Sequence, residues 1–414
     1  MRSWTLPILA VLAASLGGAL PAAPVRAQAP SAVPVLPSIT AVRVGGDGQK
    51  TRFIMDLSQK LDFAAFALAD PYRVVLDMPQ VAFHLPDKAG EQGRGLIKAF
   101  RYGLIMQGGS RVVLDTSGPV KIEKAFVLEA TSDLPARLVV DLATTDRASF
   151  LRAQTLDNGP ERRTSAKLPD LPAKADGDMR PLIVLDPGHG GIDQGARAQS
   201  GELEKDIVLQ FATTLRARLE QSGKYRVAMT RTDDTFIPLS ERVRFGRSHG
   251  AALFVSIHAD SLPKNEGQAE GATVYTLSEN ASDAEAARLA EAENKADVIA
   301  GVDLTAEPDD VANILVDLAQ RETKSYSAQF ARSVVGQLKS TARLHKHPLK
   351  SAGFKVLTAP DVPSVLIELG YMSTKDDLKL LTNGDWRAKT AASVAQAVDQ
   401  FFAPRLARGS ARAN

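Results

Sequence analysis

The sequence predicts two folded domains: an all-β sandwich domain, then an α/β domain whose mixed or mostly parallel sheet is flanked by helices. Short β-branched runs bounded by turn residues fill residues 38–145 and are typical of strands. From residue 181 onward, apolar runs alternate with segments of helical spacing, as in α/β domains. The 414 residues are enough for two domains and their tails.

The composition excludes several classes of protein. With 44% hydrophobic and 24% charged residues, the chain is of the ordinary globular kind. Lys and Arg number 50 against 48 Asp and Glu, so no nucleic-acid partner is expected from a net charge of +2. Cysteine is absent, which excludes disulfides, thiolate catalysis and cysteine-bound zinc. Any metal must therefore be held by carboxylates and the 6 histidines.

Residues 1–29 have the pattern of a cleaved secretory signal peptide. Arg2 supplies the positive start, Leu6 to Leu20 is mostly apolar, and Ala27-Gln28-Ala29 matches a cleavage site. A membrane anchor is the alternative, but a proline and two glycines interrupt an apolar run that is already short for a bilayer. No later segment is apolar enough to span. We therefore expect Sec-type export to the periplasm and no transmembrane anchor after cleavage.

Residues 37–145 contain an internal repeat that argues for a duplicated β-sandwich. A unit of Arg, three apolar residues and Asp occurs four times, at Arg52–Asp56, Arg73–Asp77, Arg111–Asp115 and Arg137–Asp141. The first and third copies have similar flanking residues, and the second and fourth each follow a proline. The simplest interpretation of these charges is that they mark strand ends.

Residues 146–179 are predicted to be a linker, because they combine prolines and basic residues with few large apolar ones. The α/β domain is expected at 180–403 and a tail at 404–414. Within the domain, strands are predicted at 182–185, 226–230, 253–257 and 272–277, and helices at 207–219, 239–248 and 386–402. Two short runs at 355–358 and 365–368 follow long helical stretches.

Polar residues follow several of these strands, at the carboxyl edge where α/β sheets bind ligands. His189 lies in a glycine turn after the first strand, His258 closes another, and Glu368 ends the last apolar run. Glu204 lies in the first turn of the helix after His189. Each has an ordinary structural interpretation when taken alone. Together, His189, Glu204 and His258 match a known ligand set for catalytic zinc, and Glu368 remains to transfer protons.

Residues 181–403 resemble the catalytic domain of zinc-dependent N-acetylmuramoyl-L-alanine amidases, which cleave bacterial peptidoglycan. The matching motifs are Leu185–Gly191, Glu204–Ile207, Val255–Asp260 and Pro363–Glu368. The resemblance implies one Zn²⁺ ion bound by His189, Glu204 and His258, with Glu368 as the catalytic carboxylate. The β domain resembles the AMIN module, which implies targeting to the cell wall or the division septum.

The resemblance implies hydrolysis of the amide between N-acetylmuramic acid and L-alanine, which releases stem peptides during septal wall splitting in cell division. Two alternatives stay open. One is a different zinc amidohydrolase, such as a peptidase or a deacetylase. The other is a peptidoglycan-binding scaffold with a degenerate catalytic domain, against which the complete set of four site residues argues.

Residues 279–310 carry ten acidic residues against two basic ones. One interpretation is a solvated acidic helix. The other, implied by the resemblance, is an autoinhibitory helix that covers the zinc cleft until a LytM-type activator protein removes it, with Glu293 as the candidate carboxylate. His345 and His347 are expected on different sides of a surface helix, and His84 and His249 have no assigned role.

Overall fold

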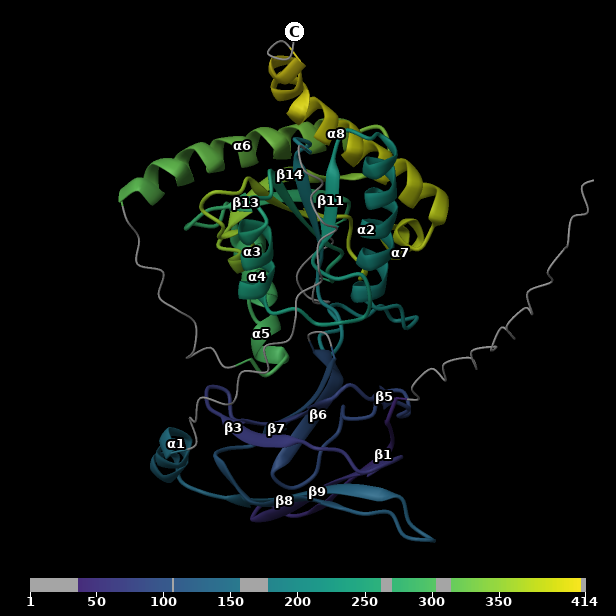
Figure 1. Cartoon of the computed structure of the whole chain (residues 1–414), viewed down its shortest axis with the longest axis vertical. Coiled ribbons are helices and arrows are strands. Elements are labelled where there is room, and N and C mark those ends of the chain that lie inside the picture. The colour runs from purple at the N-terminus through teal and green to yellow at the C-terminus, as the bar shows by residue number, and fades with distance from the viewer. Residues whose placement is uncertain (1–35, 106–107, 157–177, 262–269, 303–313, 411–414) are drawn as a thin grey trace, which may run out of the picture. The chain divides into compact units, whose positions relative to one another are not determined.

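The computed structural model describes residues 36–105, 108–156, 178–261, 270–302 and 314–410. The predicted signal peptide lies outside these ranges, as do residues 157–177 of the predicted linker. Leu36–Asn414 form one compact unit, within which a β domain precedes an α/β domain (Figure 1). None of the described helices combines the length and the apolar character that crossing a bilayer requires.

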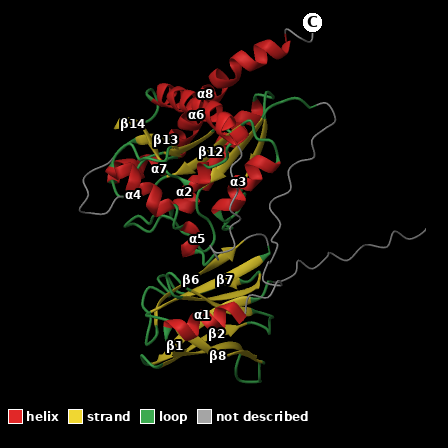
Figure 2. Cartoon of the chain, turned by 90° about the vertical axis from the view of Figure 1, so that its left-hand side faces the viewer, coloured by secondary structure: helices red, strands yellow, loops and turns green. Residues whose placement is uncertain are grey.

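Two stacked sheets form the β domain (Figure 2). The strand order is β5-β1-β2-β9-β8 in one sheet and β3-β4-β7-β6 in the other. The strands are β1 Ser38–Gly46, β2 Lys50–Leu57, β3 Ala64–Leu68, β4 Arg73–Pro79, β5 Ala82–Phe83, β6 Ile97–Ile105, β7 Gly109–Thr116, β8 Val120–Leu128 and β9 Ala136–Thr144. Inward-facing residues such as Phe53, Val74 and Leu114 are fully buried between the sheets. The predicted all-β sandwich is confirmed.

The four Arg-Asp repeats pair with one another across antiparallel strands. Arg52 of β2 lies opposite Asp141 of β9, and Arg111 of β7 lies opposite Asp77 of β4. The shortest nitrogen–oxygen distances in these two pairs are 2.6 and 2.5 Å. These four charges therefore form cross-strand ion pairs, whereas Asp56 and Asp115 pair with Arg43 and Arg101 outside the repeats. Each sheet contains one hairpin from each half of the repeat, which places Arg52 and Arg111 at equivalent positions in the two sheets.

The predicted linker begins with a helix, α1 (Arg147–Leu156). Asp146 caps it by accepting a hydrogen bond from the Ser149 amide at 2.8 Å. Phe150 is buried and packs edge to face on Tyr72, with ring centroids 5.2 Å apart. The composition of the segment did not predict this aromatic contact. The predicted tail likewise begins inside a helix, because the last helix continues to Ser410.

The α/β domain has a mixed six-stranded sheet of order β11-β10-β12-β15-β13-β14. Only the β13–β15 pairing is antiparallel among the described strands of this sheet. The strands are β10 Leu182–Pro187, β11 Arg226–Met229, β12 Leu253–His258, β13 Ala272–Leu277, β14 Leu344–Ala352 and β15 Ser364–Glu368. The helices are α2 Glu204–Gln221, α3 Leu239–Ser248, α4 Ala284–Glu293, α5 Ala296–Ile299, α6 Ile314–Leu338, α7 Lys375–Leu381 and α8 Gly384–Ser410.

Both faces of this sheet are covered, as predicted. Phe211 of α2, Phe330 of α6 and Phe402 of α8 pack against one face, while Phe245 of α3 and Leu289 of α4 pack against the other. Every residue of β10, β12 and β15 is buried, because these central strands have helices on both sides. The carboxyl ends of the three strands therefore meet at one protected edge.

The expectation of a helix at His345 and His347 is wrong, and so is the expectation of a surface position for His345. Both lie on β14, in a stretch where its pairing with β13 is irregular, and only His347 is exposed. His345 is 6% exposed, because Glu285 of α4 lies over it with Oε2 at 3.8 Å from Nε2. Polar residues and a proline hid this strand from the sequence pattern, as is common on sheet edges. The run at 355–358 is a short 3₁₀ turn at Lys355–Leu357.

Candidate metal centre

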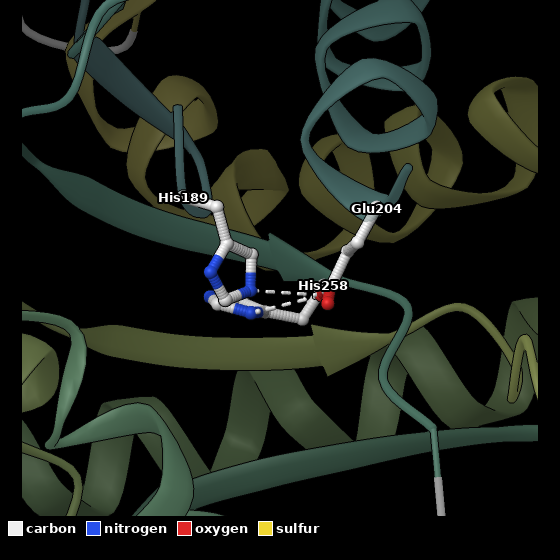
Figure 3. A group of neighbouring side chains, drawn as sticks. All are labelled: His189, Glu204 and His258. Atoms are coloured by element: carbon white, nitrogen blue, oxygen red, sulfur yellow. Dashed lines mark ion pairs between the residues drawn. The ribbon is translucent and has the colours of Figure 1, made fainter. Parts of the chain in front are cut away.

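His189, Glu204 and His258 converge at the carboxyl edge of the sheet (Figure 3). His189 follows β10, His258 is the last residue of β12, and Glu204 begins α2. Because β10 and β12 are parallel neighbours, the two histidines are brought together. Glu204 Oε1 lies 3.1 Å from His189 Nε2 and 3.3 Å from His258 Nδ1. All three side chains are buried.

Hydrogen bonds hold these side chains in place. Glu204 accepts the amide hydrogen of Ala196 on Oε2 and that of Ala259 on Oε1, each at 2.8 Å. His189 Nδ1 lies 2.9 Å from Asp193 Oδ2. An Nδ1–H that donates to this carboxylate leaves the lone pair on Nε2, which faces Glu204. Carboxylates in this position orient histidine ligands in metal sites.

Two glycines, Gly188 in the first motif and Gly195 just after it, leave the space that the ligands occupy. A Cβ on Gly188 would lie 2.3 Å from Cε1 of His258, so a side chain there would displace the ring. Gly195 has a φ of +64°, and a Cβ on it would lie 2.7 Å from both Glu204 Oε2 and His189 Cδ2. The glycine-rich turn therefore serves close packing around the histidines.

The donor set fits a zinc ion. His189 Nε2 and His258 Nδ1 are buried and have no hydrogen-bond partner among the described residues. Burying two such nitrogens without partners is costly, and both face the same carboxylate. Two imidazole nitrogens and one carboxylate oxygen form a set that binds catalytic zinc and leaves a position open.

The electrostatics of the group favour a central cation. Burial by itself would lower the pKa of His189, but Glu204, Asp193 and Glu293 raise it well above its usual value. Burial would also raise the pKa of Glu204, yet the facing His189 and His258 rings lower it well below its usual value. Carboxylates thus surround buried imidazoles and stabilise positive charge between them.

Glu368 lies beside this group. It pairs in register with His258, because β15 and β12 are parallel neighbours. Its Oε2 accepts the Asp260 amide hydrogen at 3.1 Å, while its buried Oε1 has no hydrogen-bond partner among the described residues. Burial, and then the nearby carboxylates of Glu204, Asp260 and Glu293, raise the pKa of Glu368 well above its usual value. Burial and Glu204 likewise raise the pKa of Asp260 to about 7.

Glu293, the last residue of α4, enters the same centre. Its Oε2 lies 3.1 Å from His258 Nδ1 and 3.7 Å from His189 Nε2, and the residue is 8% exposed. A small cavity of about 10 Å³ borders His189, His258 and Glu293. The acidic segment expected as one helix forms α4 and α5, and its residues 303–310 lie outside the described ranges.

A buried ion pair that the sequence interpretation missed supports the site. Asp186, fully buried at the end of β10, accepts hydrogen bonds from Thr230, Ser256 and Arg242 at 2.6, 2.7 and 2.8 Å. Arg242 also donates to the carbonyl oxygen of His189 at 2.8 Å. The available signal was the position of Arg242 on the apolar face of its helix, three residues from both Leu239 and Phe245.

Comparisons with known proteins agree with this geometry. The family model described as N-acetylmuramoyl-L-alanine amidase matches residues 183–400, and the AMIN domain model matches residues 41–142. The chain is 33% identical over 377 residues to the N-acetylmuramoyl-L-alanine amidase AmiC of Escherichia coli O6:H1 strain CFT073, which covers 88% of this chain and 89% of that protein. It is also 33% identical to AmiC of Neisseria meningitidis serogroup B, over 88% of this chain and 90% of that protein.

Two further comparisons each cover about half of this chain. The chain is 40% identical over 231 residues to AmiA of Escherichia coli K12, covering 56% of this chain and 78% of that protein. A solved N-acetylmuramoyl-L-alanine amidase from Clostridium difficile 630 covers 54% of this chain and 97% of its own, with a TM-score of 0.37 and 23% identity.

Proposed function

Since the chain belongs to the N-acetylmuramoyl-L-alanine amidase family and has an N-terminal AMIN domain, we propose that it cleaves the bond between N-acetylmuramic acid and L-alanine with one zinc ion bound by His189, Glu204 and His258. The family resemblance drawn from the motifs is thereby confirmed, and peptidoglycan is the substrate class. The observation that carries the proposed zinc site is the pair of buried histidine nitrogens that make no hydrogen bond among the described residues and face Glu204. Zinc in such a set supplies Lewis-acid activation of water and of the scissile carbonyl.

Glu368 is proposed to move the protons. It takes a proton from the attacking water as the new carbon–oxygen bond forms, and returns it to the nitrogen as the amide carbon–nitrogen bond breaks. Its raised pKa favours holding the proton between the two steps. The Asp260 amide holds one carboxylate oxygen and leaves Oε1 for the proton.

The enzyme is proposed to be autoinhibited by Glu293. This carboxylate lies 3.1 Å from His258 Nδ1 and 3.7 Å from His189 Nε2, where it competes with a substrate amide for the space beside the bound metal. A LytM-type activator would withdraw α4 and open the site. Export to the periplasm and action at the septum belong to the same proposal, supported by the signal-like residues 1–29 and the AMIN match.

The test uses the chain without residues 1–29, loaded with zinc and incubated with peptidoglycan sacculi. Newly exposed L-alanine amino termini are counted with and without a chelator, for the wild type, Glu293→Gln and Glu291→Gln. Glu291 is the matched control, because it lies on the same helix with its side chain 69% exposed and pairs only with Lys295.

We expect chelator-sensitive release that rises on the order of tenfold or more in Glu293→Gln, since a charge-assisted contact of about 1.5–3 kcal/mol is lost. Glu291→Gln should behave as wild type. Cleavage at another bond would indicate a different zinc amidohydrolase. Absence of cleavage in all three proteins, with zinc bound, would indicate a binding scaffold.

A further inference from the structure

Helix α5, which follows Glu293, ends against the four-stranded sheet of the β domain. Three arginines on β4, β6 and β7 donate hydrogen bonds to four consecutive carbonyl oxygens at its C-terminal end. The bonds run from Arg73 to Val298, from Arg101 to Ile299 at 3.2 Å, and from Arg111 to Ala300 at 3.1 Å and Gly301 at 2.8 Å.

These contacts satisfy groups that the helix leaves open. The last carbonyls of a helix lack intrahelical partners and carry partial negative charge, which positive side chains stabilise. Of these four, the Val298 carbonyl also accepts the Gly301 amide hydrogen at 3.1 Å. Aspartates orient the arginines: Asp77 pairs with Arg111 and Asp115 with Arg101, each at 2.5 Å. The guanidinium groups are therefore held ready for the α5 carbonyls.

An apolar contact completes the docking surface. Val75 and Val113 lie side by side at the centre of the sheet and belong to one buried cluster with Ala296 and Ala300. Gly301 passes directly over the two valines with a φ of +68°. A Cβ there would lie 2.9 Å from Val113 Cγ2 and 3.0 Å from Val75 Cγ2. Glycine is therefore the residue that lets the turn approach the sheet.

A short backbone segment connects the docked turn to Glu293 in the metal centre. Only Asn294 and Lys295 separate α4 from α5. Asn294 donates to the carbonyl oxygen of Gly353 at 2.8 Å, and Asp297 accepts the Leu239 amide hydrogen at 2.9 Å. Glu293 stands at the end of α4, so anchoring α5 limits how far its carboxylate can leave the histidines.

We propose that the β domain takes part in autoinhibition: the sheet surface formed by Arg73, Arg101, Arg111, Val75 and Val113 docks α5 and keeps Glu293 in the metal centre. This inference rests on the proposed inhibitory role of Glu293. Its occupant is the Val298–Gly301 turn of the same chain. Displacing this turn from the sheet releases α4, so the β domain controls activity as well as location.

The duplicated sandwich supplies a matched control. Arg52 occupies on the other sheet the place that Arg111 occupies here, and each forms a two-bond pair with an aspartate of the neighbouring strand. The Arg111 side chain is 11% exposed under α5, whereas that of Arg52 is 56% exposed. Changing either residue removes one cross-strand ion pair, but only Arg111 contacts α5.

The experiment compares Arg111→Gln, Arg52→Gln, Glu293→Gln and the double variant Arg111→Gln/Glu293→Gln, all as zinc-loaded chain without residues 1–29. Two quantities are measured: release of L-alanine amino termini from sacculi, and amide hydrogen exchange of residues 284–302. We expect Arg111→Gln to raise basal release several-fold and to speed exchange in that segment. Arg52→Gln should change neither, and the double variant should be no more active than Glu293→Gln.

The outcomes distinguish autoinhibition by Glu293 from docking of α5 by the β domain. If Glu293→Gln activates while Arg111→Gln matches Arg52→Gln in release and exchange, autoinhibition stands and docking by the β domain is wrong. If Glu293→Gln fails to activate, the inhibitory role and the regulatory inference fall together. Faster exchange in Arg111→Gln would then show docking without inhibition. Gly301→Val, which obstructs the same surface from the other side, should reproduce the effect of Arg111→Gln.

Discussion

Oε2 of Glu293 lies 3.1 Å from Nδ1 of His258, on the same nitrogen that Oε1 of Glu204 approaches at 3.3 Å. Two carboxylates from helices far apart in the sequence thus face one histidine nitrogen. Glu204 accepts hydrogen bonds from two backbone amides, whereas Glu293 is the last residue of a short helix. This difference in support is why we assign Glu204 to the metal and Glu293 to a removable inhibitor.

Replacing Glu368 should separate catalysis from metal binding. In the Glu293→Gln background, Glu368→Gln should lower kcat on the order of 100-fold or more, because proton transfer is lost. Zinc content by mass spectrometry should stay near one ion per chain. His258→Ala in the same background should lose both zinc and activity. Near-normal turnover of Glu368→Gln with zinc bound would refute the assigned role.

Asp193 should govern zinc affinity through His189. Asp193→Asn removes the carboxylate that lies 2.9 Å from Nδ1 and sets the ring orientation. We expect zinc affinity to fall about 10–100-fold, measured by competition with a chromophoric chelator. Asp206→Asn, an exposed change in the first turn of α2, is the control and should leave affinity unchanged. Equal affinities in the two variants would contradict the orienting role.

Asp186 should contribute to the stability of the fold at neutral pH but not in acid. Burial alone would raise its pKa, but Arg242 and the hydroxyls of Thr230 and Ser256 lower it below the usual 3.8. Because the folded-state pKa is the lower one, this stability is present above pH 3.8 and is lost as the pH falls below it.

Asp186→Asn should therefore lower the free energy of unfolding by about 3–5 kcal/mol at pH 7, since Arg242 loses its buried partner. The difference from wild type should shrink as the pH falls toward 3. This difference in the free energy of unfolding is measured by urea unfolding. A chelator in both samples removes any contribution from metal. A difference that stays constant over this pH range would show that the aspartate charge is not the cause.

Two glycine substitutions should have opposite effects. Gly188→Ala places a Cβ 2.3 Å from the His258 ring, so we expect the ring to move and zinc affinity to fall. Gly336→Ala lies in open space on α6 and should raise the free energy of unfolding by about 0.5–1 kcal/mol. Zinc titration measures the effect of Gly188→Ala, and thermal unfolding measures that of Gly336→Ala. Unchanged zinc affinity in Gly188→Ala would contradict the role of the close approach.

The metal centre was predicted from local sequence patterns. His258 and Glu368 each end an apolar strand and His189 follows one, and strands of this type run parallel in an α/β sheet, so these residues were expected to meet. The β14 strand was missed because Pro348 and the polar residues around it give no alternating apolar signal. Its place at the sheet edge, beside β13, depends on contacts with distant residues.

The sequence by itself determined the two domains, the duplicated Arg-Asp strands and the residues proposed to bind zinc, because strand periodicity, turn glycines and donor chemistry are encoded within short segments. Only the tertiary structure decided how closely Glu293, a candidate from the family resemblance, approaches His258 and that Arg111 holds Gly301. Arg111 and Gly301 are 190 positions apart, and no local pattern sets the distance between such residues. Packing of the whole chain brings them together, because buried carbonyls and charges must find partners wherever the fold places them.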